Sequence, residues 1–227
     1  MNTYCLTPIL VAELKILVGK DFIAQFQKEI DPVIQPLRKH ITLGRPASMG
    51  KELWEYAVAD SIVGGKWCGA GKGIADVSVG SNIGIDVKSV QTLKTATTEA
   101  SMYQPLSETE LSSEYFKNKD KQQVWNLYVN GWMKKVSAIK EYYLLAIFRD
   151  SNTLNCSLAG FKISSTALKY LDTACTFSKQ NKSMVVTSII DPVFANVKVY
   201  SGKTRLEIRI KEKIFKDPAY TMEIYKF

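Results

Sequence analysis

Hydrophobic residues follow a helical period near the start of the chain. Between residues 8 and 40 they recur mostly three or four positions apart. This spacing predicts one or two amphipathic helices, interrupted near Gly19 and closed by Pro32 and Pro36, because proline lacks the amide hydrogen that a helix interior uses. The same period over residues 50–63 predicts another helix.

From residue 74 the hydrophobic period changes to two. Alternation over residues 74–79 and 83–90 predicts two strands joined by the turn Gly80-Ser81-Asn82. A polar stretch over 91–115 then leads into a predicted helix over 118–138. The hairpin is therefore predicted to stand between two helices.

The second half of the chain is dominated by predicted strands. Residues 142–149 are almost continuously apolar, which is typical of a strand buried on both faces. Further strands are predicted over residues 155–163, 184–190, 195–200 and 204–210, the last two forming a hairpin. Helices and strands together predict an α/β fold, and no linker divides the chain, so residues 1–227 are expected to form one domain.

The pattern of the hairpin over 74–90 also predicts its pairing register. With a three-residue turn, Val79 faces Ile83, and the positions that alternate with them make one apolar face. The same register places Asp76 opposite Asp86, with Lys88 two residues further on the same face. A slip of one residue would mix the faces, so two carboxylates and one ammonium are predicted to share the polar face.

Opposing carboxylates on adjacent strands repel each other unless a positive charge lies between them. A divalent cation meets this need, and carboxylate oxygens suit Mg²⁺ that keeps several of its waters. Lys88 can orient a metal-bound water and stabilise charge on a phosphate. This chemistry predicts hydrolysis of a phosphodiester. The alternative is a solvent-facing hairpin on which Lys88 pairs with one aspartate.

The sequence Asp76…Asp86-Val87-Lys88 resembles the Asp…(Asp/Glu)-x-Lys signature of the PD-(D/E)xK nuclease superfamily, to which many type II restriction endonucleases belong. The family's element order of helix, antiparallel hairpin, helix and strand is also similar to the predicted order. The resemblance implies a restriction-endonuclease-like core, a mixed central sheet with an antiparallel catalytic hairpin flanked by helices. This core covers roughly residues 50–149, and residues 150–227 would add strands for DNA recognition.

The resemblance also implies roles for single residues. Asp76 and Asp86 would be metal ligands, with the Val87 carbonyl as a third, and Lys88 would position the attacking water. The metal would be Mg²⁺, with Mn²⁺ as a substitute. Family members often add a glutamate from the preceding helix, and Glu55 is the residue expected in this role. Glu52, nearly one turn earlier, stays open as the alternative.

Two details bear on how specific the motif is. Only one other (Asp/Glu)-x-Lys triplet occurs, Glu13-Leu14-Lys15, and no acidic residue precedes it. Ala75 stands where the family commonly, but not always, has a proline.

Composition indicates what kind of partner the protein binds and in which cellular compartment it works. The chain has 30 Lys and Arg against 22 Asp and Glu, a net charge of +8 that suits a polyanion. Lys72, Arg205 and Arg209 are the residues expected to contact DNA.

The single histidine excludes a multi-histidine zinc site, and four cysteines without a C-x-x-C pair favour a reducing cytoplasm. The longest apolar run, seven residues, is far short of the roughly 20 that span a bilayer, so no membrane contact is expected.

These observations favour a Mg²⁺-dependent endonuclease acting on double-stranded DNA, most simply a type II restriction enzyme that cuts a short specific site. The resemblance implies a homodimer and a cognate DNA methyltransferase encoded separately. Two alternatives stay open. One is a repair or mobile-element nuclease of the same superfamily, and the other is a nucleic-acid-binding domain without catalytic activity.

Overall fold

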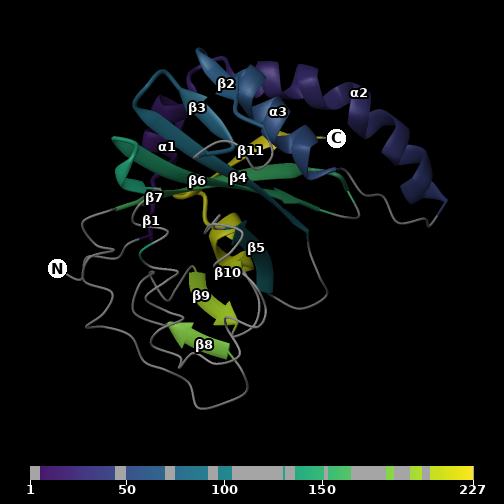
Figure 1. Cartoon of the computed structure of the whole chain (residues 1–227). Helices are drawn as coiled ribbons and strands as arrows, with labels where there is room; N and C mark the ends of the chain where they lie inside the picture. Colours follow the sequence, from purple (N-terminus) through teal and green to yellow (C-terminus); the bar gives the residue numbers. More distant parts are fainter. Residues whose placement is uncertain are drawn as a thin grey trace.

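The structure is a computed structural model of the chain (Figure 1). It describes residues 6–43, 50–69, 75–91, 97–103, 130, 136–150, 153–164, 183–186, 195–200 and 205–226. Within these residues the elements are, in chain order, β1 (Leu6–Pro8), α1 (Val11–Val18), α2 (Phe22–Thr42), α3 (Lys51–Ser61), β2 (Gly65–Trp67), β3 (Val77–Val79), β4 (Ile83–Gln91), β5 (Thr97–Tyr103), β6 (Glu141–Arg149), β7 (Cys156–Ile163), β8 (Ser183–Val186), β9 (Ala195–Tyr200), β10 (Arg205–Lys211), the 3₁₀ helix η1 (Glu212–Lys216) and β11 (Thr221–Tyr225).

The strands form two sheets. The central sheet has seven strands in the order β1-β7-β6-β4-β3-β2, with β11 also paired to β7. It is mixed, because β4 and β6 run parallel and its other paired strands are antiparallel. The small sheet has the order β5-β10-β9-β8. Helices α1, α2 and α3 cover one face of the central sheet, and the small sheet lies beyond the other side (Figure 1). The fold is therefore mixed α/β with a mixed central sheet flanked by helices.

The N-terminal helices are present, but the second is longer than predicted. α1 ends at Val18, and the next residue, Gly19, breaks the helix as expected with a positive φ of 89°. The prediction that Pro32 and Pro36 close the helix was wrong, because α2 runs through both of them. One face of α2 is fully buried. Its residues recur every four positions and are Phe22, Phe26, Ile30 and Ile34.

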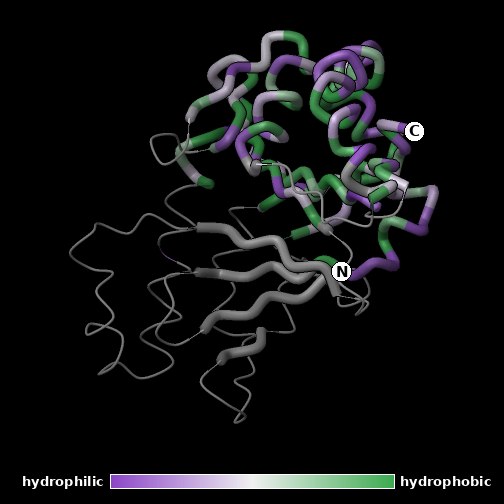
Figure 2. Tube along the Cα trace, turned by 90° about the vertical axis from the view of Figure 1, so that its right-hand side faces the viewer, coloured by the Kyte–Doolittle hydropathy of each residue, from purple (hydrophilic) through white to green (hydrophobic). Residues whose placement is uncertain are grey.

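Burial of this stripe explains why α2 continues. An interior proline costs a helix about 3 kcal/mol or more. Each buried Phe or Ile side chain contributes about 1.5–3 kcal/mol, so the four together offset both prolines. The rings of Phe22 and Phe26 stack at 5.6 Å, and Phe26 stacks on Trp54 of α3 at 6.3 Å. Figure 2 shows hydrophobic and hydrophilic residues alternating along the helices of this layer.

The predicted hairpin register is confirmed. β3 and β4 pair antiparallel with Val79 opposite Ile83 and Val77 opposite Ile85, on either side of the predicted turn. β3 is shorter than the predicted strand, because Ala75 and Asp76 form a bend just before it. β4 extends to Gln91 and lies in the interior of the central sheet, between β3 and β6.

Other predicted elements are confirmed where the structure describes them. The predicted helix over 50–63 is α3, and the strands over 142–149 and 155–163 are β6 and β7, with β6 buried along nearly its whole length. The helix predicted over 118–138 lies mostly outside the described residues. β8 is the described part of the strand predicted over 184–190, and β9 pairs with β10 as the predicted hairpin.

Four strands were missed by sequence reasoning. β1 and β2 have three residues each, too few to show a period, and β2 begins at Gly65 in a glycine-rich stretch. β5 lies in the stretch over 91–115 that was expected to be a polar loop. β11 follows η1 and, like β7, extends the central sheet with residues from beyond position 150. None of the described helices is both long and apolar enough to cross a membrane.

Gly65 sets how closely β2 approaches α3. Its amide donates to the Ile62 carbonyl at 2.8 Å. A Cβ at this position would overlap the Ala59 carbonyl oxygen and lie 2.9 Å from that of Ile62. Both obstacles are main-chain atoms, so they yield only if β2 moves away from the helix.

We therefore expect Gly65→Ala to lower the free energy of unfolding by about 1–3 kcal/mol, the usual range for an overpacked site. The matched control is Gly50→Ala, since a Cβ at Gly50 meets no atom within 4 Å. Urea unfolding of both variants measures the effect. Equal losses in the two variants would show that the contact with Ala59 is unimportant.

Candidate catalytic site

The polar face of β4 lies inside the protein. Ile85 and Val87 belong to the apolar core beneath the helices, so the alternating residues Asp86 and Lys88 lie on the opposite face of the sheet. Asp86 retains 2% and Lys88 7% of its accessible surface. These residues therefore do not belong to a solvent-facing hairpin. Charges buried to this degree are costly unless they are paired and hydrogen-bonded.

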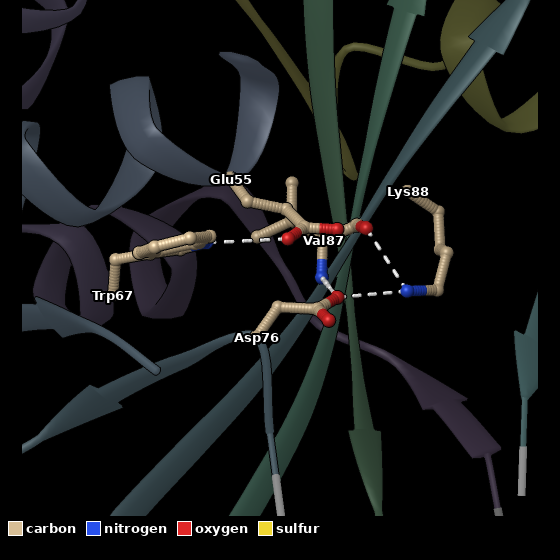
Figure 3. A network of polar contacts seen from close by, with 5 residues as sticks. All are labelled: Glu55, Trp67, Asp76, Val87 and Lys88. Atoms are coloured by element: carbon tan, nitrogen blue, oxygen red, sulfur yellow. Dashed lines mark hydrogen bonds and ion pairs between the residues drawn. The ribbon is translucent and has the colours of Figure 1, made fainter. Parts of the chain in front are cut away.

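Lys88 is paired with Asp76. The Lys88 ammonium lies 2.7 Å from Oδ2 of Asp76 and donates a second hydrogen bond to the Val87 carbonyl oxygen at 3.1 Å. The same Oδ2 accepts the Val87 amide at 2.9 Å. Figure 3 shows Asp76 reaching across to the main chain of β4 and Lys88 curling back toward it. Asp76 immediately precedes β3, which begins at Val77. It therefore contacts β4 through its side chain and not through strand pairing.

Asp86 has a different partner, Tyr142 of β6. The Tyr142 hydroxyl donates a hydrogen bond to the Asp86 carboxylate, and Tyr142 retains only 1% of its accessible surface. Burial and then the negative charge of Asp86 raise the pKa of the Tyr142 hydroxyl well above its usual range, so it stays a donor. The two aspartates that the sequence was expected to place opposite each other are therefore held by different groups.

Gly84 makes room for the Tyr142 ring. Gly84 is the register partner of Tyr142 across the parallel β4–β6 pair. A Cβ on Gly84 would lie 3.4 Å from Cδ2 of Tyr142 and 3.2 Å from Cβ of Ala75, and it would overlap the end of the Ile139 side chain. The small residue two positions before Asp86 therefore allows the tyrosine to approach that carboxylate.

Glu55 is the glutamate that α3 turns into the interior. It retains 1% of its accessible surface, and its Oε2 accepts a hydrogen bond from Nε1 of Trp67 at 3.3 Å. The Trp67 ring in turn stacks on Tyr56 at 4.0 Å. Glu52 is exposed, so of the two glutamates Glu55 is the one that α3 turns inward. In Figure 3 the Glu55 side chain extends from α3 toward the main chain at Val87.

The donor set has the chemistry that a hard divalent cation prefers. Asp76, Asp86 and the Val87 carbonyl offer only oxygen atoms. Among the described residues, Oδ2 of Asp76 is the oxygen that accepts both hydrogen bonds, and Oδ1 accepts neither. Within the same residues, no three His, Cys, Asp or Glu side chains form a metal-holding group. The ligands that the resemblance implies are two carboxylates and a main-chain carbonyl, and these residues fit Mg²⁺ by donor type.

The residues expected to contact DNA are only partly described. Lys72 lies outside the described residues. Arg205 and Arg209 occupy alternate positions of β10, opposite Tyr103 and Glu99 of β5, and their side chains lie outside the description. They therefore remain predictions, since the structure gives only their main-chain places on the small sheet.

Sequence reasoning missed two residues of the site. Tyr142 was assigned to a buried strand, and nothing in its local pattern shows that its hydroxyl meets Asp86, which is 56 positions earlier in the chain. Trp67 was expected to be a core residue, and its ring does pack against the core while its Nε1 contacts Glu55. A buried tyrosine needs a partner for its hydroxyl, which was the available signal for Tyr142.

Comparisons of the chain with protein-family models, with curated proteins and with solved structures found no match.

We expect Tyr142→Phe to lower the free energy of unfolding by about 1–3 kcal/mol, because the buried Asp86 carboxylate loses a hydrogen-bond donor. The matched control is Tyr143→Phe, one residue further along β6. The Tyr143 hydroxyl donates to Glu141, a carboxylate that keeps 37% of its side-chain surface exposed. Water can replace that hydroxyl, so the control should lose less than about 1 kcal/mol. Chemical unfolding measures the free energy of unfolding of both variants. An equal loss would show that the Tyr142–Asp86 hydrogen bond stabilises the fold no more than the exposed one does.

Proposed function

We propose that this protein is a Mg²⁺-dependent endonuclease that hydrolyses phosphodiester bonds of double-stranded DNA, acting as a type II restriction enzyme at a short specific site. The observation that carries the proposal is the ion pair between the buried Lys88 and the partly buried Asp76, with the buried Asp86 two residues before Lys88 on the same face of β4. A surface hairpin would leave these charges in water at little cost. Burial of Asp86 and Lys88, with Asp76 partly buried beside them, favours a site over an incidental ion pair.

The proposed roles follow from the positions of the side chains. Asp76, Asp86 and the Val87 carbonyl would hold the metal ion, which would supply Lewis acidity and lower the pKa of a bound water when present. Lys88 would orient the attacking water and stabilise negative charge on the phosphate. Tyr142 would keep the Asp86 carboxylate in one orientation, and Glu55 would serve as the helix glutamate. Mn²⁺ is expected to replace Mg²⁺.

The remaining parts of the proposal concern the fold, partners and location. The mixed sheet and its antiparallel hairpin support a restriction-endonuclease-like core. A net charge of +8 supports a polyanionic substrate. The proposed enzyme is a cytoplasmic homodimer whose two-fold symmetry matches a palindromic site, and its own genome is protected by a separately encoded DNA methyltransferase. Lys72, Arg205 and Arg209 are proposed to contact the DNA.

Digestion of unmethylated plasmid and phage DNA tests the proposal. We expect discrete fragments with Mg²⁺ or Mn²⁺ and none with chelator. Asp86→Asn and Lys88→Met should each lower the cleavage rate by at least about a hundredfold, the usual contribution of a catalytic group. The matched control is Lys15→Met in the other (Asp/Glu)-x-Lys triplet, which lies on the exposed part of α1 and should cut at the normal rate.

The pattern of products separates the alternatives. A Mg²⁺-dependent smear, or cutting of branched DNA only, would favour a repair or mobile-element nuclease. DNA binding that survives Asp86→Asn and Lys88→Met, with no cleavage of duplex, branched or single-stranded DNA by the unaltered protein, would favour a binding domain. In that case the proposed enzyme activity would be wrong.

The role of Glu55 has its own matched pair of variants. Glu55→Gln should lower the cleavage rate at least about tenfold, because it removes a buried charge next to the proposed site. Glu52→Gln, on the exposed side of the same helix turn, should leave the rate unchanged. Single-turnover cleavage at saturating Mg²⁺ gives both rates, and far-UV circular dichroism checks that α3 is intact. Equal rates would remove Glu55 from the proposed site.

A further inference from the structure

The Lys88 ammonium lies between two oxygen atoms that the proposed function assigns to the metal ion. It contacts Oδ2 of Asp76 at 2.7 Å and the carbonyl oxygen of Val87 at 3.1 Å. A cation therefore already bridges two of the three proposed ligands. The contact differs from the role of a lysine that only orients water, because here the ammonium itself neutralises a ligand carboxylate.

The local charge balance makes this contact important. Asp76, Asp86 and Glu55 supply carboxylates, and the buried positive groups among the described residues are Lys88 and Arg149. Arg149 ends β6, seven residues beyond Tyr142, and its register partners are Gln91 and Cys156. Lys88 is therefore the described cation that offsets Asp76. A carboxylate in this position would otherwise be left without a compensating charge.

We propose that Lys88 is the resident counter-cation of the metal-free site and exchanges with the divalent ion when that ion binds. The proposal rests on the metal site of the proposed function. Lys88 gives up Oδ2 of Asp76 and the Val87 carbonyl to the ion. Its ammonium then becomes available to water and to phosphate, so Lys88 reaches its catalytic position only in the metal-loaded protein.

The exchange predicts an unusual effect of losing the lysine. Removing a lysine that only positions water takes away a nearby like charge and strengthens metal binding slightly. Removing an ammonium that occupies two of the ligand oxygens should strengthen it much more. Without the ammonium, Asp76 and Asp86 repel each other in a buried setting until a cation binds. The metal-free protein should therefore be less stable and the metal-bound protein more favoured.

Calorimetric titration with Ca²⁺ and with Mg²⁺, in the absence of DNA, measures the effect directly. Lys88→Met and Lys88→Gln should bind each ion about tenfold more tightly than the unaltered protein, a change of about 1.4 kcal/mol. Lys88→Arg keeps the charge and should stay near the original affinity. The matched control is Lys162→Met, which breaks the exposed 3.3 Å ion pair with Glu141 on the same sheet and should not change metal binding.

Thermal unfolding supplies a second measurement. Both neutral variants should melt at a lower temperature than the unaltered protein in chelator and should recover more of that loss in Ca²⁺ than Lys162→Met does. Glutamine can still donate to Asp76, so Lys88→Gln keeps the test available where Lys88→Met fails to fold without metal. Folding of a neutral variant only in Ca²⁺ would support the exchange. Failure of both neutral variants to fold at saturating Ca²⁺ would overturn it.

The outcomes separate this inference from the proposed function. Unchanged or weaker metal binding by the neutral variants overturns the exchange, whether or not the unaltered protein cuts DNA. Tighter binding by these variants, together with no DNA cleavage by the unaltered protein, supports the exchange and overturns the nuclease. Absence of metal binding in the unaltered protein and in all three Lys88 variants overturns both.

Discussion

The ion pair between the buried Lys88 and the partly buried Asp76 is the interaction on which the site depends. The polar face of β4 has little access to water, since Asp86 and Lys88 are both buried there, and each of these charges therefore needs a partner. The ammonium bonds Asp76 and the Val87 carbonyl, and Asp76 also accepts the Val87 amide. These three hydrogen bonds join the ion pair to the main chain of β4 and to the residue before β3. They give the site a defined geometry before any ligand binds.

The surrounding scaffold places different demands on the two faces of β4. On one face Val87 joins the apolar core with Trp54 and the helices. On the other, the absence of a side chain at Gly84 lets the Tyr142 ring approach and its hydroxyl reach Asp86. One strand thus anchors the fold through its apolar residues and the site through its polar ones. Such a division is expected where a functional group must be both buried and rigid.

Local pattern predicted most of what β4 contributes and little of what surrounds it. The register of Val79 with Ile83 followed from the alternation and the turn, and with it the shared face of Asp76, Asp86 and Lys88. The two prolines of α2 led to the wrong prediction of a helix end. The sequence shows the local cost of a proline, but it does not show that the helix is buried against residues far away in the chain. Short strands such as β2 carry too few residues to show a period.

The sequence by itself determined which residues share the polar face, since a strand has a period of two and a turn of known length sets the pairing. Only the tertiary structure decided that this face is buried, that Lys88 bonds Asp76, and that Asp86 is held by Tyr142 from another strand. It also decided that α3 turns Glu55 inward and Glu52 outward. Burial and pairing depend on contacts between residues far apart in the chain, and no local pattern contains them.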